Sequence, residues 1–342
     1  MKLRQFQSFL SKEKIDAAIL FHPDTHITYF SRMVPSHAIM VITPRTADLY
    51  LSKLDLPPHV TGIRNKNLSK EWEKEIKNSS YKIIGINKGS LSVQQLEKLQ
   101  QIFPKAAWKD VGETITYLRT IKTAKEIEYT EKACTITSEA FAALVKELPK
   151  RTLKTEQDVA LFLEKYMKNA GAQLAFPTIV GSDVNSSIPH HVTSNSLLKK
   201  GFLQLDFGAR WKNYCADMSR VIYLGKASPS ELSSYAQLLS VQEQCINDVR
   251  ENKLYKELDH LARKMLGKDA KYFIHGLGHG VGIDIHETPV YTNATVQQGH
   301  VFTIEPGVYF PNKFGLRIED TLVFNGKVTV LTTASKRLVE IQ

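Results

Sequence analysis

The first third of the chain alternates between two patterns of apolar residues. Residues 3–10 and 91–103 carry apolar side chains at helical spacing, whereas residues 17–21, 38–42 and 81–86 form short apolar runs. Short apolar runs bounded by turn residues are typical of buried strands. Strands that alternate with helices predict an open α/β sheet of modest size in this part of the chain.

A mostly helical stretch follows. Residues 113–148 read as helix almost throughout, with one short interruption at residues 120–123. A second helix is predicted from Thr155 to Asn169, because Thr155 is followed three positions later by an acidic residue, which resembles a capping box. Gly171 is placed to end this helix.

Beyond residue 171 the character of the sequence is that of strands. Short alternating runs are separated by glycine, proline and asparagine, which is the usual pattern of strands and turns. The change of character near residue 112 predicts a domain boundary there. We therefore expect two domains, residues 1–112 and residues 113–342, which agrees with a length of 342 residues at roughly 150 residues per domain.

Composition restricts the class of protein. Hydrophobic residues make up 42% of the chain and charged residues 23%, which excludes a disordered or fibrous protein. No apolar run approaches the roughly 20 residues that cross a bilayer, so we expect no membrane partner. The three cysteines are widely spaced and form no C-x-x-C pair, which argues against a disulfide framework and for a cytoplasmic location.

The net charge of +10 raises the question of a nucleic-acid partner. The lysines are spread along the whole chain, and no block of five like charges or arginine-rich arm is present. Scattered lysines are typical of a solvated surface. We therefore expect no nucleic-acid partner.

Candidate chemistry begins with two aspartates on strand-like segments. Asp206 lies in the alternating run 203–208, and Asp217 lies in a second run, 214–223. A turn centred on residues 211–212 would place the two aspartates directly opposite each other in a hairpin. Like charges in that position are destabilising, so we expect a cation between them.

A histidine- and glycine-rich segment, residues 275–287, is the second element. His275 and His279 are four positions apart, but the alternating glycines make a helical zinc motif improbable. An extended chain also places both histidines on one face, because four is an even step. The glycines allow close approach of the backbone to neighbouring chain, and His286 follows in the same segment.

Two further acids complete the set. Glu305 follows an apolar strand and precedes a Pro-Gly break, and alternation places Arg317 and Glu319 on one face of a later strand. Two carboxylates 4 Å apart repel by about 4 kcal/mol at an effective dielectric constant near 20. Divalent cations would neutralise such a group, and oxygen ligands with one imidazole suit Mn²⁺, Fe²⁺, Co²⁺ or Zn²⁺.

In this order and spacing, these residues resemble the aminopeptidase P and prolidase family of the pita-bread metallopeptidases. The resemblance is strong from about residue 112 to the end and weaker before it. It implies an α+β protein with a catalytic pita-bread domain, an antiparallel sheet flanked by helices. A smaller α/β domain of the creatinase and prolidase type would precede it, close the substrate pocket and take part in dimerisation.

The resemblance also implies roles for individual residues. Two divalent ions per subunit, Mn²⁺ in the first place and otherwise Co²⁺, Fe²⁺ or Zn²⁺, would be bound by a set of four acids and one imidazole: Asp206, Asp217, His279, Glu305 and Glu319. Asp217 and Glu319 would bridge both ions, and the hydroxide between the ions would attack the peptide carbonyl. Glu305 would also transfer a proton.

Further side chains would serve the substrate. His190 and His286 would contact the substrate and stabilise the tetrahedral intermediate, and His275 is characteristic of the proline-specific branch. Arg317 would orient the neighbouring carboxylates. His191, beside His190, points away by strand parity and is predicted to be structural.

The implied reaction is hydrolysis of the bond between an N-terminal residue and proline in short peptides, by a homodimer. The sequence leaves open whether the enzyme is a dipeptidase or an aminopeptidase. An enzyme like methionine aminopeptidase is disfavoured by His275 and by the additional N-terminal domain. A catalytically silent peptide-binding module of the same fold is disfavoured because every metal ligand is retained.

Overall fold

The computed structural model describes residues 2–69, 72–291 and 293–342. The chain divides into two compact units, Met1–Arg119 and Thr120–Gln342. The boundary expected near residue 112 coincides with the start of the helix α5 (Gly112–Thr120), which ends at this division.

The first unit is built on a mixed sheet with strand order β4-β3-β2-β1-β5-β6. β1 pairs antiparallel with β2 and parallel with β5. The strands are β1 (Ala17–Phe21), β2 (Ala38–Ile42), β3 (Ala47–Leu51), β4 (Arg64–Asn67), β5 (Ile83–Ile86) and β6 (Ala107–Asp110). The helices before α5 are α1 (Lys2–Lys12), α2 (Thr25–Ser31), α3 (Trp72–Lys77) and α4 (Val93–Ile102). The predicted strands 17–21 and 38–42 are thus confirmed.

The second unit contains several linked sheets between two pairs of helices. Their strand orders are β20-β12-β9-β8, β14-β13-β15-β18-β19, β11-β10-β7 and β16-β17. The strands are β7 (Gln173–Leu174), β8 (Ile179–Ser182), β9 (Gly201–Phe207), β10 (Ala209–Trp211), β11 (Tyr214–Cys215), β12 (Met218–Leu224), β13 (His279–Gly280), β14 (Glu287–Val290), β15 (His300–Ile304), β16 (Gly307–Phe310), β17 (Phe314–Arg317), β18 (Asp320–Phe324), β19 (Val328–Val330) and β20 (Val339–Ile341). All of these strand pairs are antiparallel except the pairing of β12 with β20.

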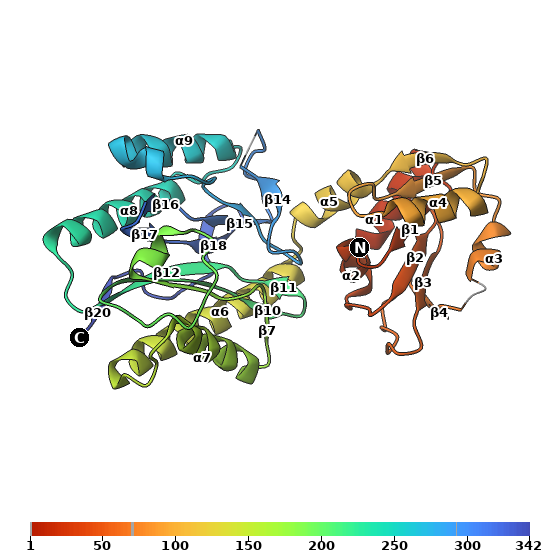
Figure 1. Ribbon diagram of the computed structural model, residues 1–342. Helices are drawn as coiled ribbons and strands as arrows, with labels where there is room; N and C mark the ends of the chain where they lie inside the picture. The colour runs from red at the N-terminus through yellow and green to blue at the C-terminus, as the bar shows by residue number, and fades with distance from the viewer. Residues whose placement is uncertain (1, 70–71, 292) are drawn as a thin grey trace. The chain divides into compact units, whose positions relative to one another are not determined.

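The helices of this unit lie on both sides of the sheets (Figure 1). They are α6 (Ala124–Glu147), α7 (Glu156–Asn169), α8 (Pro229–Asn247) and α9 (Tyr255–Leu266), with the short 3₁₀ helices η1 (Leu148–Lys150), η2 (Asp183–Ser187) and η3 (Gly267–Tyr272). One apolar core joins α6 and α7 to one face of the sheets, and a second core joins α8 and α9 to the opposite face. The sheets are therefore buried on both faces, and polar groups concentrate where strands end.

The predicted helix ends are confirmed because they depend on local interactions. The Thr155 hydroxyl accepts a hydrogen bond from the Asp158 amide, and the Asp158 carboxylate accepts one from the Thr155 amide. Such reciprocal caps satisfy N–H groups that have no partner within the helix. The interruption at residues 120–123 separates α5 from α6 as predicted.

The predicted register of the hairpin that carries the two aspartates is wrong. Asp206 pairs with Ser219 rather than with Asp217. The turn residues are Lys212 and Asn213, both in the left-handed region with φ of 49° and 72°, as a two-residue hairpin loop requires. Asp217 therefore lies diagonally from Asp206 on the same face, at a distance that long or charged side chains can bridge.

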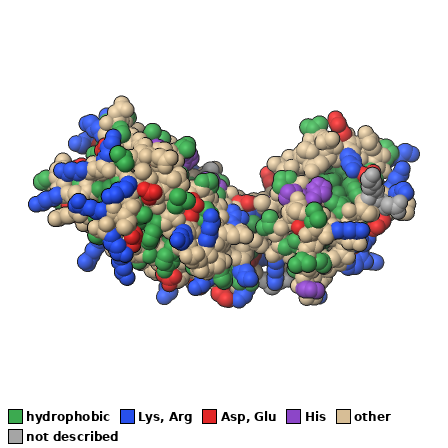
Figure 2. Space-filling model, turned by 60° about the horizontal axis from the view of Figure 1, so that its bottom comes forward, with side chains coloured by type: hydrophobic (Ala, Val, Ile, Leu, Met, Phe, Trp, Pro, Cys, Tyr) green, Lys and Arg blue, Asp and Glu red, His purple; other side chains and the backbone are tan. Residues whose placement is uncertain are grey.

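Basic side chains are spread over the surface in the way that the lysines are spread along the sequence. On the face shown in Figure 2, lysine and arginine side chains are spread over both units with acidic side chains between them. In the part of the chain that the structure describes, no helix combines the length and the apolar character needed to cross a membrane.

Candidate metal centre

A pocket of about 780 Å³ in the second unit brings together every side chain that the sequence predicts for the site. The predicted residues in its lining are His190, Asp206, Asp217, His275, His279, His286, Glu305, Arg317 and Glu319. Apolar side chains, including Phe176, Ile188 and Ile274, form much of the remaining wall. The lining of the pocket therefore combines charged and apolar side chains.

The acids and the imidazole come from strand ends of both larger sheets. Asp206 lies on β9, Asp217 directly precedes β12, and His279 begins β13. Glu305 follows β15, and Glu319 lies between β17 and β18. Segments distant in sequence meet here because the strands of the two sheets carry these residues at or near their ends.

The glycines of the histidine segment allow β13 to fit between its neighbours. A Cβ atom at Gly278 would lie 2.2 Å from the Thr303 carbonyl oxygen, and one at Gly280 would lie 2.3 Å from the Thr288 carbonyl group. No other residue fits these positions without movement of the backbone. This close approach brings His279 to the acidic groups.

The distances are those of a group able to bind a metal ion. Asp217, His279 and Glu319 each offer one ligand atom, and these atoms lie within 4.8 Å of one another. The His279 Nε2 atom is 3.5 Å from Asp217 Oδ2 and 3.4 Å from Glu305 Oε1. Its Nδ1 atom lies 3.1 Å from the Gly280 carbonyl oxygen. A proton on Nδ1 donated to that carbonyl would leave the Nε2 lone pair directed at the acids.

Electrostatics show that the acids repel one another. Burial, followed by the charge of Glu319, raises the pKa of Asp217 well above its usual value. Burial and the charge of Glu305 do the same to the pKa of Glu319, and burial raises the pKa of Glu305 to about 7. Burial and His286 lower the pKa of His279 to about 3, so this imidazole is neutral and able to ligate.

Two buried carboxylate oxygens indicate whether the site suits a cation. Asp206 Oδ1 and Glu319 Oε1 are buried, and neither has a hydrogen-bond partner among residues 2–69, 72–291 and 293–342. A buried acceptor without a partner costs about 1–3 kcal/mol, and more when it is charged. A cation at this end of the pocket would satisfy both oxygens, so the donor set fits divalent metal ions.

Arg317 holds two of the acids through hydrogen bonds. Its Nη2 atom donates to Asp206 Oδ2, and its Nε atom donates to the Ser219 hydroxyl at 2.7 Å. The Ser219 hydroxyl in turn donates to Glu319 Oε2 at 2.9 Å. The guanidinium therefore orients one acid directly and another through Ser219.

The sequence analysis did not identify Tyr309. Its hydroxyl accepts a hydrogen bond from Arg317 Nη1 at 2.7 Å and lies 2.9 Å from His275 Nε2. Because the hydroxyl oxygen accepts a hydrogen bond from Arg317, the hydroxyl group donates its own hydrogen bond to His275 Nε2. The ring proton of His275 is therefore assigned to Nδ1, which lies 2.8 Å from the Gly276 carbonyl oxygen. Tyr309 lies on β16 two positions after Gly307, which pairs with Arg317 on β17, so its contact with Arg317 follows from strand pairing and has no local signal in the sequence.

His286 and His190 also line the pocket. The ring of His286 lies 4.2 Å from that of His279, centroid to centroid. The next residue, Glu287, forms a buried ion pair of 2.8 Å with Lys122, which ties this segment to the start of α6. His190 is exposed, on the loop that follows η2.

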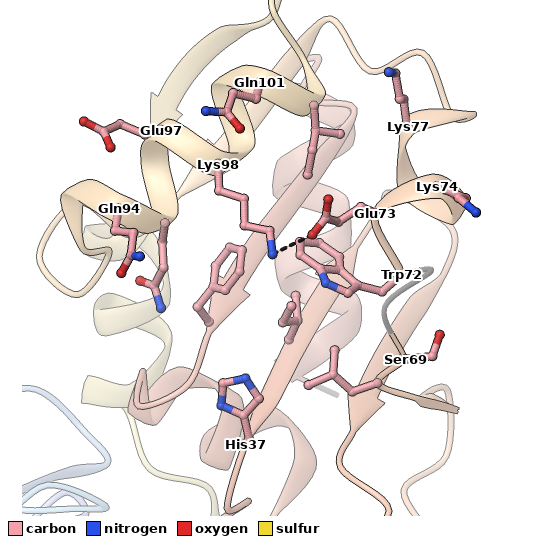
Figure 3. A pocket seen from close by; sticks show the side chains of 15 residues that line it. His37, Ser69, Trp72, Glu73, Lys74, Lys77, Gln94, Glu97, Lys98 and Gln101 are labelled. Atoms are coloured by element: carbon pink, nitrogen blue, oxygen red, sulfur yellow. Dashed lines mark ion pairs between the residues drawn. The ribbon is translucent and has the colours of Figure 1, made fainter.

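A second hollow, of about 1120 Å³, lies in the first unit between α3 and α4. Figure 3 shows Lys98 extending from α4 toward Trp72 and Glu73. Lys98 forms an ion pair of 2.5 Å with Glu73. Its lining contains none of the side chains predicted for the site. This hollow therefore shares no lining residue with the candidate metal centre.

Two protein-family models match this chain. The model of metallopeptidase family M24 matches residues 128–325, and that of the creatinase/prolidase N-terminal domain matches residues 2–121. The Xaa-Pro dipeptidase of Pyrococcus horikoshii is 32% identical over 100% of this chain and 97% of the relative.

Solved structures of similar proteins show the same fold. The prolidase from Pyrococcus horikoshii superposes with a TM-score of 0.90 at 31% identity, covering 99% of each chain. The X-Pro aminopeptidase from Thermotoga maritima gives a TM-score of 0.87 at 27% identity, covering 96% of this chain and 98% of that one. Fold and site together define a metal-dependent peptide hydrolase.

The chain belongs to metallopeptidase family M24. The resemblance drawn from the sequence and the predicted α+β architecture with a pita-bread domain are thereby confirmed.

Proposed function

We propose that this enzyme hydrolyses the peptide bond between an N-terminal residue and proline, with two divalent ions held by Asp206, Asp217, His279, Glu305 and Glu319. The observation that carries the proposal is the convergence of these side chains, with two buried carboxylate oxygens that have no partner in the described chain. The full-length relatives named as Xaa-Pro dipeptidases support the substrate class.

The ions, when bound, lower the pKa of water and supply a hydroxide nucleophile near neutral pH, and they neutralise the acids. Asp217 and Glu319 would hold both ions. Asp206 would contribute to one of them, and His279 and Glu305 to the other. Mn²⁺ is the first choice of metal, with Co²⁺, Fe²⁺ or Zn²⁺ as alternatives.

The chain's own residues then carry out the proton transfer. A bond to proline has a tertiary amide nitrogen without a proton, so the leaving nitrogen must be protonated as the bond breaks. Burial raises the pKa of Glu305 to about 7 when no cation is near, and bound cations would lower it and favour the charged carboxylate, which can accept a proton. Glu305 would take the proton of the nucleophile and return it to the proline nitrogen.

Histidines and apolar side chains would hold the substrate. His190 and His286 line the pocket and would stabilise the charge that develops on the carbonyl oxygen, a contribution of roughly 2.7–4 kcal/mol per donor in other enzymes. His275 also lines the pocket, on the side of Tyr309. Ile188 and Ile274, which are 52% and 65% exposed, offer apolar surface to a proline ring or its preceding side chain.

Hydrolysis of Met-Pro and of a tripeptide Met-Pro-Ala by metal-reconstituted protein tests the proposal. We expect release of methionine from Met-Pro in the presence of Mn²⁺, and none from the variant Asp217→Ala. Cleavage of Met-Pro alone identifies a dipeptidase, and cleavage of the tripeptide identifies an aminopeptidase. Release of methionine from Met-Ala-Ala without cleavage of either proline peptide would instead favour an enzyme like methionine aminopeptidase.

We also propose that the protein is a cytoplasmic homodimer. The free, buried cysteines Cys134, Cys215 and Cys245 agree with a reducing compartment. The dimer rests on the family resemblance, and light scattering of the purified protein measures its mass directly. A monomer at catalytic concentrations would overturn it.

A further inference from the structure

Glu156 is a buried carboxylate outside the lining of the metal centre. It is the first residue of α7 and is fully buried. Its Oε1 atom accepts hydrogen bonds of 2.8 Å from both the Ser182 amide and the Asn185 side chain. Its Oε2 atom lies 2.8 Å from His191 Nε2 and accepts a bond of 3.1 Å from the Ser194 hydroxyl. One carboxylate thus holds both ends of the loop 182–194.

This loop carries His190. The opposite side of the loop is attached to β17, because the Gly315 amide donates to the Ser186 hydroxyl at 2.9 Å and Arg317 Nη1 donates to the Pro189 carbonyl at 3.4 Å. His190 itself is exposed. Its place in the pocket wall is therefore determined by the backbone on either side, Pro189 toward the metal centre and His191 toward Glu156.

We propose that Glu156 is a positioning residue that orders the loop 182–194 and thereby presents His190 to the substrate; the second part rests on the proposed function of His190. His191, predicted to be structural, is the link between the carboxylate and the residue next to His190. No ligand of the metal ions contacts Glu156 in this arrangement of hydrogen bonds.

The role requires a charged carboxylate. Burial raises the pKa of Glu156, but the hydrogen bonds from Ser182, Asn185 and His191 outweigh it, and the net pKa is lowered. Both oxygens can therefore accept. Glutamine at this position would have one oxygen and one NH₂ group. The NH₂ group would then face the donors from which one of the two carboxylate oxygens now accepts hydrogen bonds. The helix N-terminus also favours a negative charge at this position.

The variant Glu156→Gln tests the inference, with Asp158→Asn as the matched control. Asp158 lies on the same helix, where its carboxylate accepts hydrogen bonds from the Lys154 and Thr155 amides, which precede the helix and lie outside the loop. We expect Glu156→Gln to lower kcat for Met-Pro about 10- to 100-fold, the size of effect that a small misplacement produces. KM and bound metal should change little, and Asp158→Asn should retain kcat.

A double-mutant cycle with His190→Ala separates positioning from a general structural role. If Glu156 acts through His190, Glu156→Gln should lower kcat by no more than about twofold in the His190→Ala background. Amide hydrogen exchange in residues 183–194 should also be faster in Glu156→Gln than in Asp158→Asn. If Glu156→Gln yields too little folded protein, His191→Leu removes one link from the loop side and should show a smaller effect with the same non-additivity.

The inference is overturned if Glu156→Gln lowers kcat equally in both backgrounds, or if exchange in the loop does not change. Full activity of His190→Ala would overturn both the role of His190 and its positioning. Failure of the wild-type protein to cleave any proline peptide would overturn the proposed function alone, since the exchange experiment still decides whether Glu156 orders the loop.

Discussion

Arg317 and Ser219 lie 98 positions apart in the sequence and are joined by a hydrogen bond of 2.7 Å from the Arg317 Nε atom to the Ser219 hydroxyl. The same hydroxyl donates to Glu319 Oε2 at 2.9 Å. Ser219 is fully buried, so water does not readily take the place of its hydroxyl group in these hydrogen bonds. A small polar side chain on β12 therefore connects the arginine to a proposed bridging ligand.

Replacement of Ser219 by alanine should weaken metal binding. The change leaves a buried Arg317 donor and a Glu319 acceptor without this partner, at a cost of about 1–3 kcal/mol in the free energy of unfolding. Loss of such an outer partner typically lowers metal affinity about 10- to 100-fold. Calorimetric titration with Mn²⁺ measures the affinity. Ser219→Thr, which keeps the hydroxyl, is the control, and equal affinities of the two variants would contradict the role assigned to Ser219.

Asp217→Ala should abolish both metal binding and hydrolysis. Asp217 offers a ligand atom that lies within 4.8 Å of those of His279 and Glu319. Its removal leaves neither proposed ion with a complete set of ligands. His190→Ala is the contrasting variant: it should retain bound metal and lose turnover. Elemental analysis of both variants after dialysis decides the matter, and full metal content in Asp217→Ala would show that this carboxylate is not a bridging ligand.

Tyr309→Phe should disturb His275 without affecting the fold. The hydroxyl joins Arg317 to His275 Nε2, and its loss removes the group that holds the His275 proton on Nδ1. Nitrogen NMR of the imidazole should show a lower share of this tautomer. The value of kcat/KM for Met-Pro should fall about tenfold, which is less than the roughly 10²–10⁴-fold contribution of a direct proton donor, because Tyr309 acts through His275. Tyr235→Phe, which removes a buried hydroxyl bonded to the Lys336 carbonyl, should change neither quantity.

His300 should make the protein less stable in acid. Burial lowers the pKa of His300 to about 4, from an ordinary value of 6.5. Between these values the unfolded chain binds a proton that the folded protein does not, so stability falls as the pH decreases from about 6.5 to about 4 and then levels off. The full effect is at most about 3.5 kcal/mol, because a pKa difference of one corresponds to about 1.4 kcal/mol.

Urea unfolding of the wild-type protein and of His300→Gln at pH 7, 5.5 and 4.5 measures this contribution. The variant should be less stable at pH 7, since it loses the hydrogen bonds that His300 Nδ1 forms with the Gln297 amide and the Tyr255 hydroxyl. The difference between the two proteins should shrink as the pH falls. A constant difference would mean that His300 takes up its proton equally in the folded and unfolded states.

Features that depend on neighbouring residues could be predicted from the sequence alone. The helix α7 begins after its Thr155 cap and ends at Asn169 as predicted, because capping hydrogen bonds form within one turn. The strands 17–21 and 38–42 were recognisable by their continuous apolar runs. The need for divalent cations could also be predicted, because several acids and an imidazole in strand contexts require a cation to be buried together.

Only the tertiary structure decided which side chains meet. The register of the hairpin depends on the backbone conformation at Lys212 and Asn213, and residue identity restricts that conformation only weakly, so the direct pairing of Asp206 with Asp217 was predicted wrongly. The contacts of Arg317 with Ser219 and of Glu156 with the loop of His190 join distant segments through side-chain hydrogen bonds. Such bonds exist only once the sheets and helices have packed, because the chain brings these groups within hydrogen-bonding distance through its fold and not through its local order.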